Sequence, residues 1–268
     1  MAGRLAILAC SGALPVEIAK ANPGALKIGF AGVPNELPGD VHEFRFEKLG
    51  ALWAFLRENS VERVVFAGGL ARPPLDPSAF DSGMAAVAPR LAAAMSGGDD
   101  ALLRLVIAVF EEQGFKVVGA HEVCPGLTAG HAFEIGGSPS DADMSDAARA
   151  RSILAALSPL DIGQACVVAG GQCLGIETMQ GTDALLRFVA STPPLQRPKA
   201  PGVLVKAAKT GQDLRIDMPG IGPETVIATA RAGLAGIIVE PQRVMILNRE
   251  EVTDALGDTG LFLAARRT

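Results

Sequence analysis

The stretch RLAILACSGALPVEIAKA, residues 4–21, decides the fold class of this chain. Its first six residues, RLAILA, are almost wholly apolar, which is typical of a strand buried on both faces of a parallel sheet. The small residues Cys10, Ser11 and Gly12 then predict a tight turn, and Pro15 falls in the first turn of the helix expected next. Strand, turn and helix in this order begin an α/β fold.

The same alternation continues as far as residue 120. Strand–helix alternation of this kind implies a mostly parallel sheet with helices on its faces. Residues 1–130 are therefore predicted to form a Rossmann-like N-terminal domain. Its further strands are expected at 26–30, 41–46, 64–67 and 116–120, and its further helices at 48–59, 78–95 and 101–113.

The second half of the chain has a different pattern. Between residues 128 and 140 the sequence lapses into Gly, Ser and Pro, so we place a linker at 131–140 and a C-terminal catalytic domain at 141–268. A hairpin is expected around Gly170 and Gly171. This domain is predicted to be mixed α/β, of the α+β kind, with helices at 141–157, 182–190, 224–232 and 249–256 and strands at 164–169, 173–178, 203–207, 237–239, 244–247 and 261–265.

Composition narrows the class of protein. About half of the 268 residues are apolar, enough for a sizeable core, and the net charge of −5 argues against binding of duplex DNA or bulk RNA. No apolar run reaches the roughly 18 residues of a membrane span, and the first strand leaves no room for a leader, so a cytoplasmic protein is expected. Cys166 and Cys173 face each other across the expected hairpin or stay as two separate reduced thiols.

The richest polar segment is KAAKTGQDLRIDMPGIGPET, residues 206–225. Lys206, Lys209, Asp213, Arg215 and Asp217 fall within it. Interleaved cations and carboxylates suit a pyrophosphate, whose charge must be neutralised by Lys and Arg or by a metal held on carboxylates. The segment therefore indicates a site for a phosphorylated ligand.

The backbone of this segment decides how its charges are displayed. If residues 212–217 are extended, Asp213, Arg215 and Asp217 share one face of the strand. The alternative is a solvated strand edge with alternating charges. A Pro/Gly-rich turn follows, and the helix that starts near Thr225 directs its positive end at the same anion.

A second polar island is ETMQGTDALLR, residues 177–187. Glu177 ends an expected strand, and Thr182 is expected to cap a helix whose second residue is Asp183. Carboxylates at strand ends are a common place for ligand contacts, although Thr182 can equally be a simple helix cap.

Two turns in the N-terminal half are weaker candidates. Gly12 offers backbone N–H groups to an anion, but it is the only glycine of a G-x-G-x-x-G fingerprint, so a plain strand–helix turn is the alternative. Asp99 and Asp100 precede a helix, where one can cap and the other can reach a ligand. Arg104 lies one helical turn beyond Asp100, so it can contact the ligand or pair with Asp100.

Five stretches of the chain carry a recognisable pattern: GDDALLR (98–104), DIGQACVV (161–168), IETMQGTDALLR (176–187), KAAKTGQDLRIDMPGIGPET (206–225) and AGLAGIIVE (232–240). Together they resemble the LpxI-type UDP-2,3-diacylglucosamine pyrophosphatases of Gram-negative lipid A biosynthesis, and the likeness extends over nearly the whole chain. The opening LACSGALP is similar to that family's opening, with Cys10 and Ser11 where a glycine is usual, and Gln180 stands where the family usually has Glu.

The resemblance implies a specific reaction. It is hydrolysis of UDP-2,3-diacylglucosamine to 2,3-diacylglucosamine 1-phosphate (lipid X) and UMP, by water directed at the phosphorus on the sugar side. A divalent metal, Mg²⁺, is implied as cofactor, and the lipid is expected between the two domains. Transient contact with the inner membrane face is expected, a homo-oligomer is left open, and no nucleic acid is involved.

The resemblance places the family's essential acid on Asp217. From the chemistry of the residues, we expect Asp217 to hold the metal or activate the water, with Asp213 as a second catalytic acid. Glu177 and Asp183 would complete the metal shell. The expected substrate-binding residues are Gly12, Asp99, Asp100, Arg104, Gln164, Thr182, Lys206, Lys209, Gln212, Arg215 and Thr225.

Two other functions stay open from the sequence. An NAD(P)-dependent oxidoreductase would need the dinucleotide fingerprint and a ribose-binding acid, which this chain lacks. A non-catalytic regulator that binds a sugar nucleotide or lipid would keep the same pocket without turnover.

Overall fold

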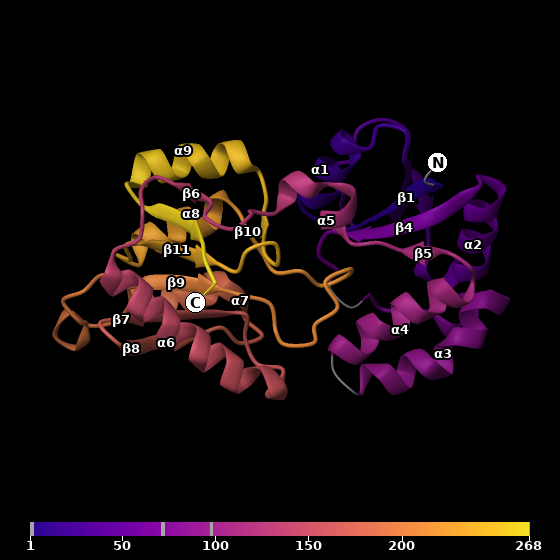
Figure 1. Ribbon diagram of the computed structural model, residues 1–268. Coiled ribbons are helices and arrows are strands. Elements are labelled where there is room, and N and C mark those ends of the chain that lie inside the picture. The colour runs from indigo at the N-terminus through magenta and orange to yellow at the C-terminus, as the bar shows by residue number, and fades with distance from the viewer. Residues whose placement is uncertain (1–2, 71–72, 97–98, 268) are drawn as a thin grey trace. The chain divides into compact units, whose positions relative to one another are not determined.

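The computed structural model describes residues 3–70, 73–96 and 99–267, apart from the side chains of Asp99 and Asp100. Contacts divide the chain into two compact units (Figure 1). Unit 1 is Met1–Pro125 together with Asp213–Asp217, and unit 2 is Gly126–Gln212 with Met218–Thr268. The polar segment 206–225 is thus shared between the two units.

Unit 1 contains a five-stranded sheet in the order β3-β2-β1-β4-β5, with every neighbouring pair parallel. The chain runs outward from β1 to β3 and then crosses back to β4 and β5, which is the doubly wound order of a Rossmann-like sheet. The predicted fold class of the N-terminal half is confirmed. The strands are β1 (Arg4–Ala9), β2 (Leu26–Phe30), β3 (His42–Phe44), β4 (Val61–Ala67) and β5 (Lys116–Val117).

Helices enclose the unit 1 sheet because its strands are apolar on both faces. Helices α2, α3 and α4 bury their apolar sides against residues such as Leu8 and Ile28, while α1 and α5 contact β1 and β4. The helices are α1 (Leu14–Ala21), α2 (Leu49–Glu58), α3 (Ser82–Met95), α4 (Asp99–Glu112) and α5 (Ala120–Val123), with 3-10 turns η1 (Phe46–Lys48), η2 (Pro77–Ala79) and η3 (Pro125–Leu127).

Unit 2 is built on a six-stranded mixed sheet in the order β6-β13-β11-β9-β7-β8. Strands β9, β11 and β13 are parallel, whereas β6, β7 and β8 pair antiparallel with their neighbours. A separate parallel pair joins β10 to β12. The strands are β6 (Glu134–Ile135), β7 (Ala165–Ala169), β8 (Gln172–Ile176), β9 (Val203–Lys206), β10 (Gly220–Ile221), β11 (Gly236–Val239), β12 (Met245–Ile246) and β13 (Phe262–Ala265).

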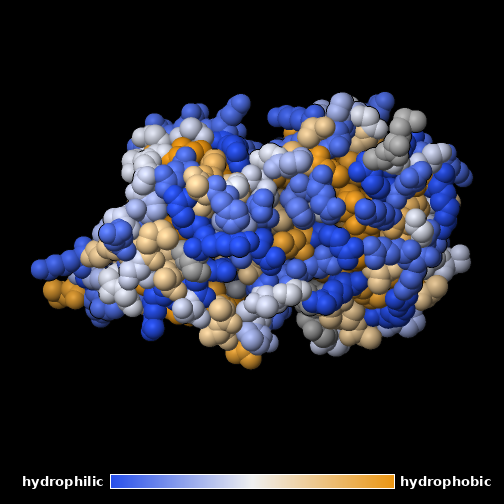
Figure 2. Space-filling model, in the orientation of Figure 1, coloured by the Kyte–Doolittle hydropathy of each residue, from blue (hydrophilic) through white to orange (hydrophobic). Residues whose placement is uncertain are grey.

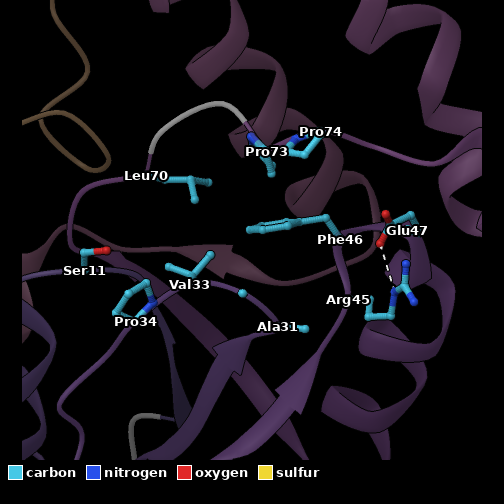
Figure 3. A pocket seen from close by; sticks show the side chains of 11 residues that line it. Ser11, Ala31, Val33, Pro34, Arg45, Phe46, Glu47, Leu70, Pro73 and Pro74 are labelled. Carbon is cyan, nitrogen blue, oxygen red and sulfur yellow. Dashed lines mark hydrogen bonds and ion pairs between the residues drawn. The ribbon is translucent and has the colours of Figure 1, made fainter.

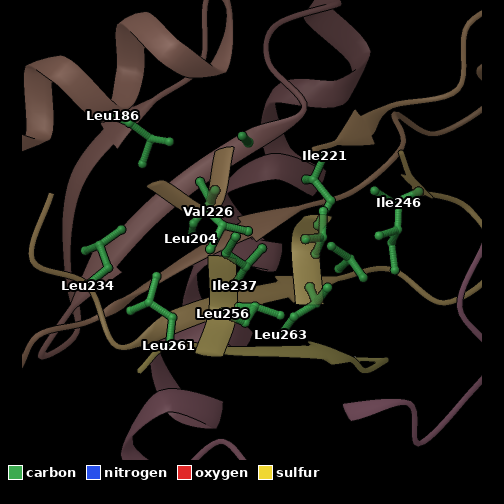
Figure 4. Packing of buried hydrophobic residues seen from close by; sticks show 14 of the residues in the cluster. Leu186, Leu204, Ile221, Val226, Leu234, Ile237, Ile246, Leu256, Leu261 and Leu263 are labelled. Atoms are coloured by element: carbon green, nitrogen blue, oxygen red, sulfur yellow. The ribbon is translucent and has the colours of Figure 1, made fainter. Parts of the chain in front are cut away.

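The two faces of the unit 2 sheet carry different helices, because alternate strand residues point to opposite sides. Leu204, Ile237 and Leu263 pack with α7, α8 and α9 (Figure 4), whereas Val205 and Ile238 pack with α6. The mixed α/β prediction is confirmed. The helices are α6 (Asp141–Leu157), α7 (Gly181–Ala190), α8 (Pro223–Arg231) and α9 (Arg249–Thr259), with 3-10 turns η4 (Ser158–Leu160) and η5 (Pro194–Gln196).

The predicted hairpin joins β7 to β8. Gly170 and Gly171 both have positive φ, +54° and +75°, which suits a tight turn between antiparallel strands. Their N–H groups donate to the two carboxylate oxygens of Asp146, a buried residue of α6, at 2.9 and 2.6 Å. The turn is therefore fastened to the helix beneath it.

Four sequence expectations differ from the structure. The expected strand 116–120 ends at Val117, because α5 starts at Ala120, and the expected strand 41–46 shortens to His42–Phe44. Residues 131–140, expected to be a linker, contain β6, which pairs with β13. Residues 212–217 are not extended: the N–H groups of Ile216 and Asp217 both donate to the carbonyl oxygen of Asp213, as in a helical turn.

Candidate functional site

Unit 2 brings together three polar residues that are far apart in the sequence, here called the Lys206 cluster: Lys206, Glu177 and Thr182. Lys206 Nζ donates to Thr182 Oγ1 at 2.6 Å, and that hydroxyl donates to Glu177 Oε2 at 2.8 Å. Lys206 Nζ lies 3.9 Å from the same carboxylate oxygen. All three were predicted site residues, and the fold places them side by side.

The topology of the sheet explains this meeting. Lys206 ends β9, and Glu177 directly follows β8. Because β7 pairs antiparallel with both strands, β8 and β9 run in the same direction and their carboxyl ends lie at the same end of the sheet. The Glu177 N–H donates to the carbonyl oxygen of Ala165 at 2.8 Å, which fixes its place beside β7. Thr182 was expected to cap α7, but the helix starts at Gly181, so its hydroxyl bonds the cluster instead.

Burial makes the charge of Lys206 significant. The residue is only 7% exposed, and a buried ammonium is stable only where hydrogen bonds and an opposite charge compensate its lost hydration. Thr182 and Glu177 provide that compensation. A phosphate that approached this cluster would meet a positioned cation in a partly dehydrated setting, where electrostatic attraction is strong.

A second group of predicted residues lies on the following loop of unit 2. Lys209 Nζ forms an ion pair with Asp161 at 2.5 Å, and the Lys209 N–H donates to Gln212 Oε1 at 2.9 Å. The carbonyl oxygen of Gln164 accepts the N–H of Ala207 at 2.9 Å, which continues the β7–β9 edge. The ion pair with Asp161 was not expected from the sequence.

The remaining charges of the polar segment belong to unit 1. The Arg215 guanidinium donates to both carboxylate oxygens of Asp213, at distances from 2.7 to 3.2 Å, and to Glu111 Oε1 of α4 at 2.8 Å. Hydrogen bonds from Arg215 hold the pKa of Asp213 below its usual range, and the nearby charge of Arg104 adds to this. The hydrogen bonds to Asp213 and the charges of Asp213 and Glu111 in turn raise the pKa of Arg215.

Arg215 has protein partners in the structure that the sequence did not predict. Its guanidinium was expected to bind phosphate, and in the structure it donates hydrogen bonds to Asp213 and Glu111. Glu111 was missed, since α4 lies more than a hundred residues earlier and the pair depends on tertiary structure. Asp217 is half-buried in the same turn, and its N–H donates to the carbonyl oxygen of Asp213 at 3.2 Å.

Two further predicted residues lie in the first turns of unit 2 helices. Thr225 is buried in the first turn of α8, and its hydroxyl accepts the N–H of Gly222 at 3.3 Å. Asp183 is exposed in the first turn of α7. The roles predicted for Asp99 and Asp100 depend on side chains that lie outside the described part of the structure.

The part of the chain that the structure describes contains no group of three or more His, Cys, Asp or Glu side chains arranged to hold a metal ion. The expected ligands are divided: Glu177 and Asp183 belong to unit 2, and Asp217 belongs to unit 1. This does not conflict with Mg²⁺, which is usually bound by one or two carboxylates together with substrate phosphates.

Unit 1 has a pocket of about 480 Å³ at the carboxyl ends of its parallel strands (Figure 3). It is lined by residues that follow β1, β2, β3 and β4, which is where doubly wound sheets bind ligands. The Phe46 ring lies along one wall, and Arg45 pairs with Glu47 at 3.3 Å near it. Its lining residues are Ser11, Ala31, Gly32, Val33, Pro34, Arg45, Phe46, Glu47, Leu70, Pro73 and Pro74.

Gly12 lies beside this pocket in sequence and has φ +96° with open space where a Cβ would stand. The preceding turn is tied to the end of β4 by mutual backbone hydrogen bonds between Ser11 and Gly69, at 3.1 and 2.9 Å. The structure thus places Gly12 in unit 1, at a strand end next to the pocket wall.

Large apolar side chains are exposed on the chain segments that adjoin Glu177. Met179 follows Glu177 by two residues and is 96% exposed, and Leu160 is 66% exposed. The backbone at Gly163 runs next to Glu177, because a Cβ there would lie 2.6 Å from the Glu177 carbonyl oxygen. The face drawn in Figure 2 is mostly hydrophilic, with hydrophobic residues showing between the polar ones. Among the described residues, no helix is long and apolar enough to span a membrane.

Comparison with known proteins gives matches along almost the whole chain. Residues 4–127 match the family model described as the LpxI N-terminal domain, and residues 132–264 match the LpxI C-terminal domain. A curated protein of Caulobacter vibrioides named UDP-2,3-diacylglucosamine pyrophosphatase LpxI is 38% identical over 270 residues, which cover 97% of this chain and 96% of the relative. Every candidate residue from Gly12 to Thr225 lies within the matched ranges.

Proposed function

Because this chain belongs to the LpxI family, we propose that it hydrolyses the pyrophosphate bond of UDP-2,3-diacylglucosamine, giving 2,3-diacylglucosamine 1-phosphate and UMP for lipid A biosynthesis. The observation that carries the proposal is the 38% identity to a named pyrophosphatase, which extends through both units. The Lys206 cluster supplies the chemistry that such a substrate needs. An oxidoreductase is not favoured, because neither the matches nor the turn at Gly12 points to a dinucleotide.

Pyrophosphate hydrolysis needs an oriented water and compensation for the charge that builds on phosphate oxygens. We assign the second task to Lys206, whose ammonium is held by Thr182 and Glu177. We assign the first to Asp217, as the acid that activates the water. Asp213 is proposed to act on Arg215, which it already binds, and so to hold the turn that carries Asp217.

A divalent metal is part of the proposal. When bound, Mg²⁺ would neutralise charge on the pyrophosphate oxygens. Glu177 and Asp183, which flank the start of α7, offer the hard oxygen ligands that this ion prefers. Removal of divalent ions with EDTA is expected to abolish hydrolysis, and added Mg²⁺ is expected to restore it; undiminished turnover in EDTA would rule the metal out.

The nucleotide end of the substrate is proposed to bind the unit 1 pocket. Its volume lies within the roughly 300–1,000 Å³ of small-molecule sites, and the Phe46 ring offers an apolar surface for a base. Phe46→Ala is expected to raise KM and weaken UMP binding, whereas Phe188→Ala, which removes an exposed ring of unit 2, is the matched control. Equal UMP affinity in both variants would contradict this placement.

A lipid substrate also calls for contact with a membrane surface. Met179 follows Glu177 by two residues, and Ile162 precedes Gly163, whose backbone runs next to Glu177. Both residues, together with Leu160, expose apolar atoms that would enter a lipid layer. Met179→Ser is expected to reduce co-sedimentation with phospholipid vesicles. Leu195→Ser is the control, because this fully exposed residue lies in the loop that packs near Gly170, at the opposite edge of the sheet.

The reaction itself is tested with the purified chain and UDP-2,3-diacylglucosamine in water enriched in heavy oxygen. Mass spectrometry is expected to find lipid X and UMP, with the label on the lipid phosphate, because the water is proposed to attack the phosphorus on the sugar side. Label on UMP would place the attack at the other phosphorus. Unchanged substrate would favour the alternative of a binding protein without turnover.

A further inference from the structure

Cys166 and Cys173 form a thiol pair that the proposed hydrolysis does not use. Cys166 lies on β7 and is fully buried, whereas Cys173 lies on β8 and is exposed. Their Sγ atoms are 3.8 Å apart, and the Cys173 thiol also faces the carbonyl oxygen of Gly175 at 3.7 Å. A solvent-accessible thiol next to a second thiol is the usual arrangement of an oxidisable pair.

The strand register explains why the sulfur atoms meet. Cys173 is opposite Val168, and Cys166 is opposite Ile176, so the cysteines lie diagonally across the β7–β8 pair. The pairing shifts between Val167 and Val168, which loosens the ladder at this point. A disulfide needs its sulfur atoms about 2.05 Å apart, so bond formation must draw β8, the last strand of the sheet, toward β7.

We propose that Cys166 and Cys173 form a reversible intramolecular disulfide when the protein meets hydrogen peroxide. The Cys173 thiolate attacks one peroxide oxygen, the O–O bond breaks, hydroxide leaves, and Cys173 becomes a sulfenic acid. Cys166 Sγ then attacks the Cys173 sulfur, the S–O bond breaks, and the oxygen leaves as water with the proton of Cys166. Two thiols and one peroxide thus give one disulfide and two waters.

Burial sets the order of these steps. Burial raises the pKa of the Cys166 thiol well above its ordinary value, so this thiol stays protonated and out of reach of the oxidant. The exposed Cys173 therefore meets the peroxide first, and Cys166 resolves the sulfenic acid that forms next to it.

The disulfide would affect the Lys206 cluster by moving Glu177. Glu177 directly follows β8 and lies 3.9 Å from Lys206 Nζ, so movement of β8 toward β7 changes this approach. This consequence rests on the proposed function: the oxidised protein is expected to hydrolyse its substrate more slowly than the reduced protein does.

The disulfide is tested on the full chain, treated with hydrogen peroxide and then denatured and alkylated with a maleimide. Two of the four cysteines are expected to escape alkylation, with a linked Cys166–Cys173 peptide in the digest and full recovery after dithiothreitol. Cys124→Ser, the matched control, is expected to keep the link, and Cys173→Ser to lose it. Four alkylated cysteines, or sulfinic acid at Cys173 without a link, would overturn the proposal.

Rate measurements on the same samples separate this inference from the proposed function. Oxidised wild-type protein is expected to lose rate and to regain it with dithiothreitol, whereas peroxide leaves the rate of Cys173→Ser unchanged. Equal rates before and after disulfide formation would overturn the link to the Lys206 cluster. A reduced protein without hydrolysis would contradict the proposed function, while the alkylation result still decides whether the disulfide forms.

Discussion

Lys206, at the end of β9, is a buried cation that contacts Thr182 and Glu177. Lys206→Met keeps the approximate length of the side chain but removes its charge. Glu177 then lacks its opposite charge, and the phosphate of the substrate lacks the cation that we propose stabilises it. We expect kcat/KM to fall about a hundredfold, the size of effect seen when one charge-stabilising donor is removed from a hydrolase site. Steady-state hydrolysis of UDP-2,3-diacylglucosamine is the measurement.

A matched variant separates this effect from a general loss of positive charge. Lys199→Met also removes a lysine charge from unit 2, but Lys199 is exposed in the loop near Gly170. Its kcat/KM is expected to stay near the wild-type value. Equal losses in the two variants would show that the position of Lys206 is unimportant.

Asp213 gives the protein a stability that depends on pH. Hydrogen bonds from Arg215 lower the pKa of Asp213 in the folded state, so the fold favours its ionised form. That contribution is complete at neutral pH, above the unfolded value of about 3.9, and is lost as the pH falls through the lower folded value. Asp213→Asn removes it.

The pH dependence of thermal unfolding measures this contribution. We expect the wild-type protein to have the higher unfolding midpoint at neutral pH and the difference from Asp213→Asn to shrink as the pH is lowered below 4. A difference that stays constant over this range would mean that ionisation of Asp213 adds nothing to stability.

At the scale of elements, substitutions at two glycines show how closely the turn after β4 packs against the turn after β1. Gly68 and Gly12 have almost the same positive φ, +95° and +96°, but a Cβ at Gly68 would lie 2.4 Å from the carbonyl oxygen of Ser11, whereas Gly12 has open space. Both alanine variants carry the backbone cost of roughly 1–2 kcal/mol. Gly68→Ala adds a steric clash.

We therefore expect Gly68→Ala to lower the midpoint of thermal unfolding clearly more than Gly12→Ala does. Circular dichroism during heating is sufficient for the comparison. Similar midpoints for the two variants would mean that the turn at Ser11 yields easily and does not fix the end of β4.

The elements show what local sequence can and cannot predict. Apolar runs and turn residues predicted β1, the β7–β8 hairpin and α6 well, because period and turn chemistry are local properties. The turn at Asp213–Asp217 was missed, since alternating charges imitate an exposed strand while tertiary bonds to Glu111 favour a helical turn. The role of Thr182 was missed in part, because its partner Lys206 lies on another strand.

At the scale of the whole molecule, the division into two units separates the predicted catalytic residues. Glu177, Thr182 and Lys206 form one group in unit 2, and Asp213, Arg215 and Asp217 belong to unit 1. No sequence pattern predicted this division, because the five residues Asp213–Asp217 belong to a unit that otherwise consists of residues 1–125. The family match extends over both units, so hydrolysis is a property we assign to the complete chain.

Turnover by Asp217→Ala is the most direct test of the central claim. The assay compares purified wild-type and Asp217→Ala protein for release of UMP from UDP-2,3-diacylglucosamine, alongside substrate binding and thermal unfolding. We expect the wild-type protein to release UMP and lipid X, and the variant to fold and bind the substrate without hydrolysing it. Near-normal hydrolysis by Asp217→Ala, or none by the wild-type protein, would contradict the account.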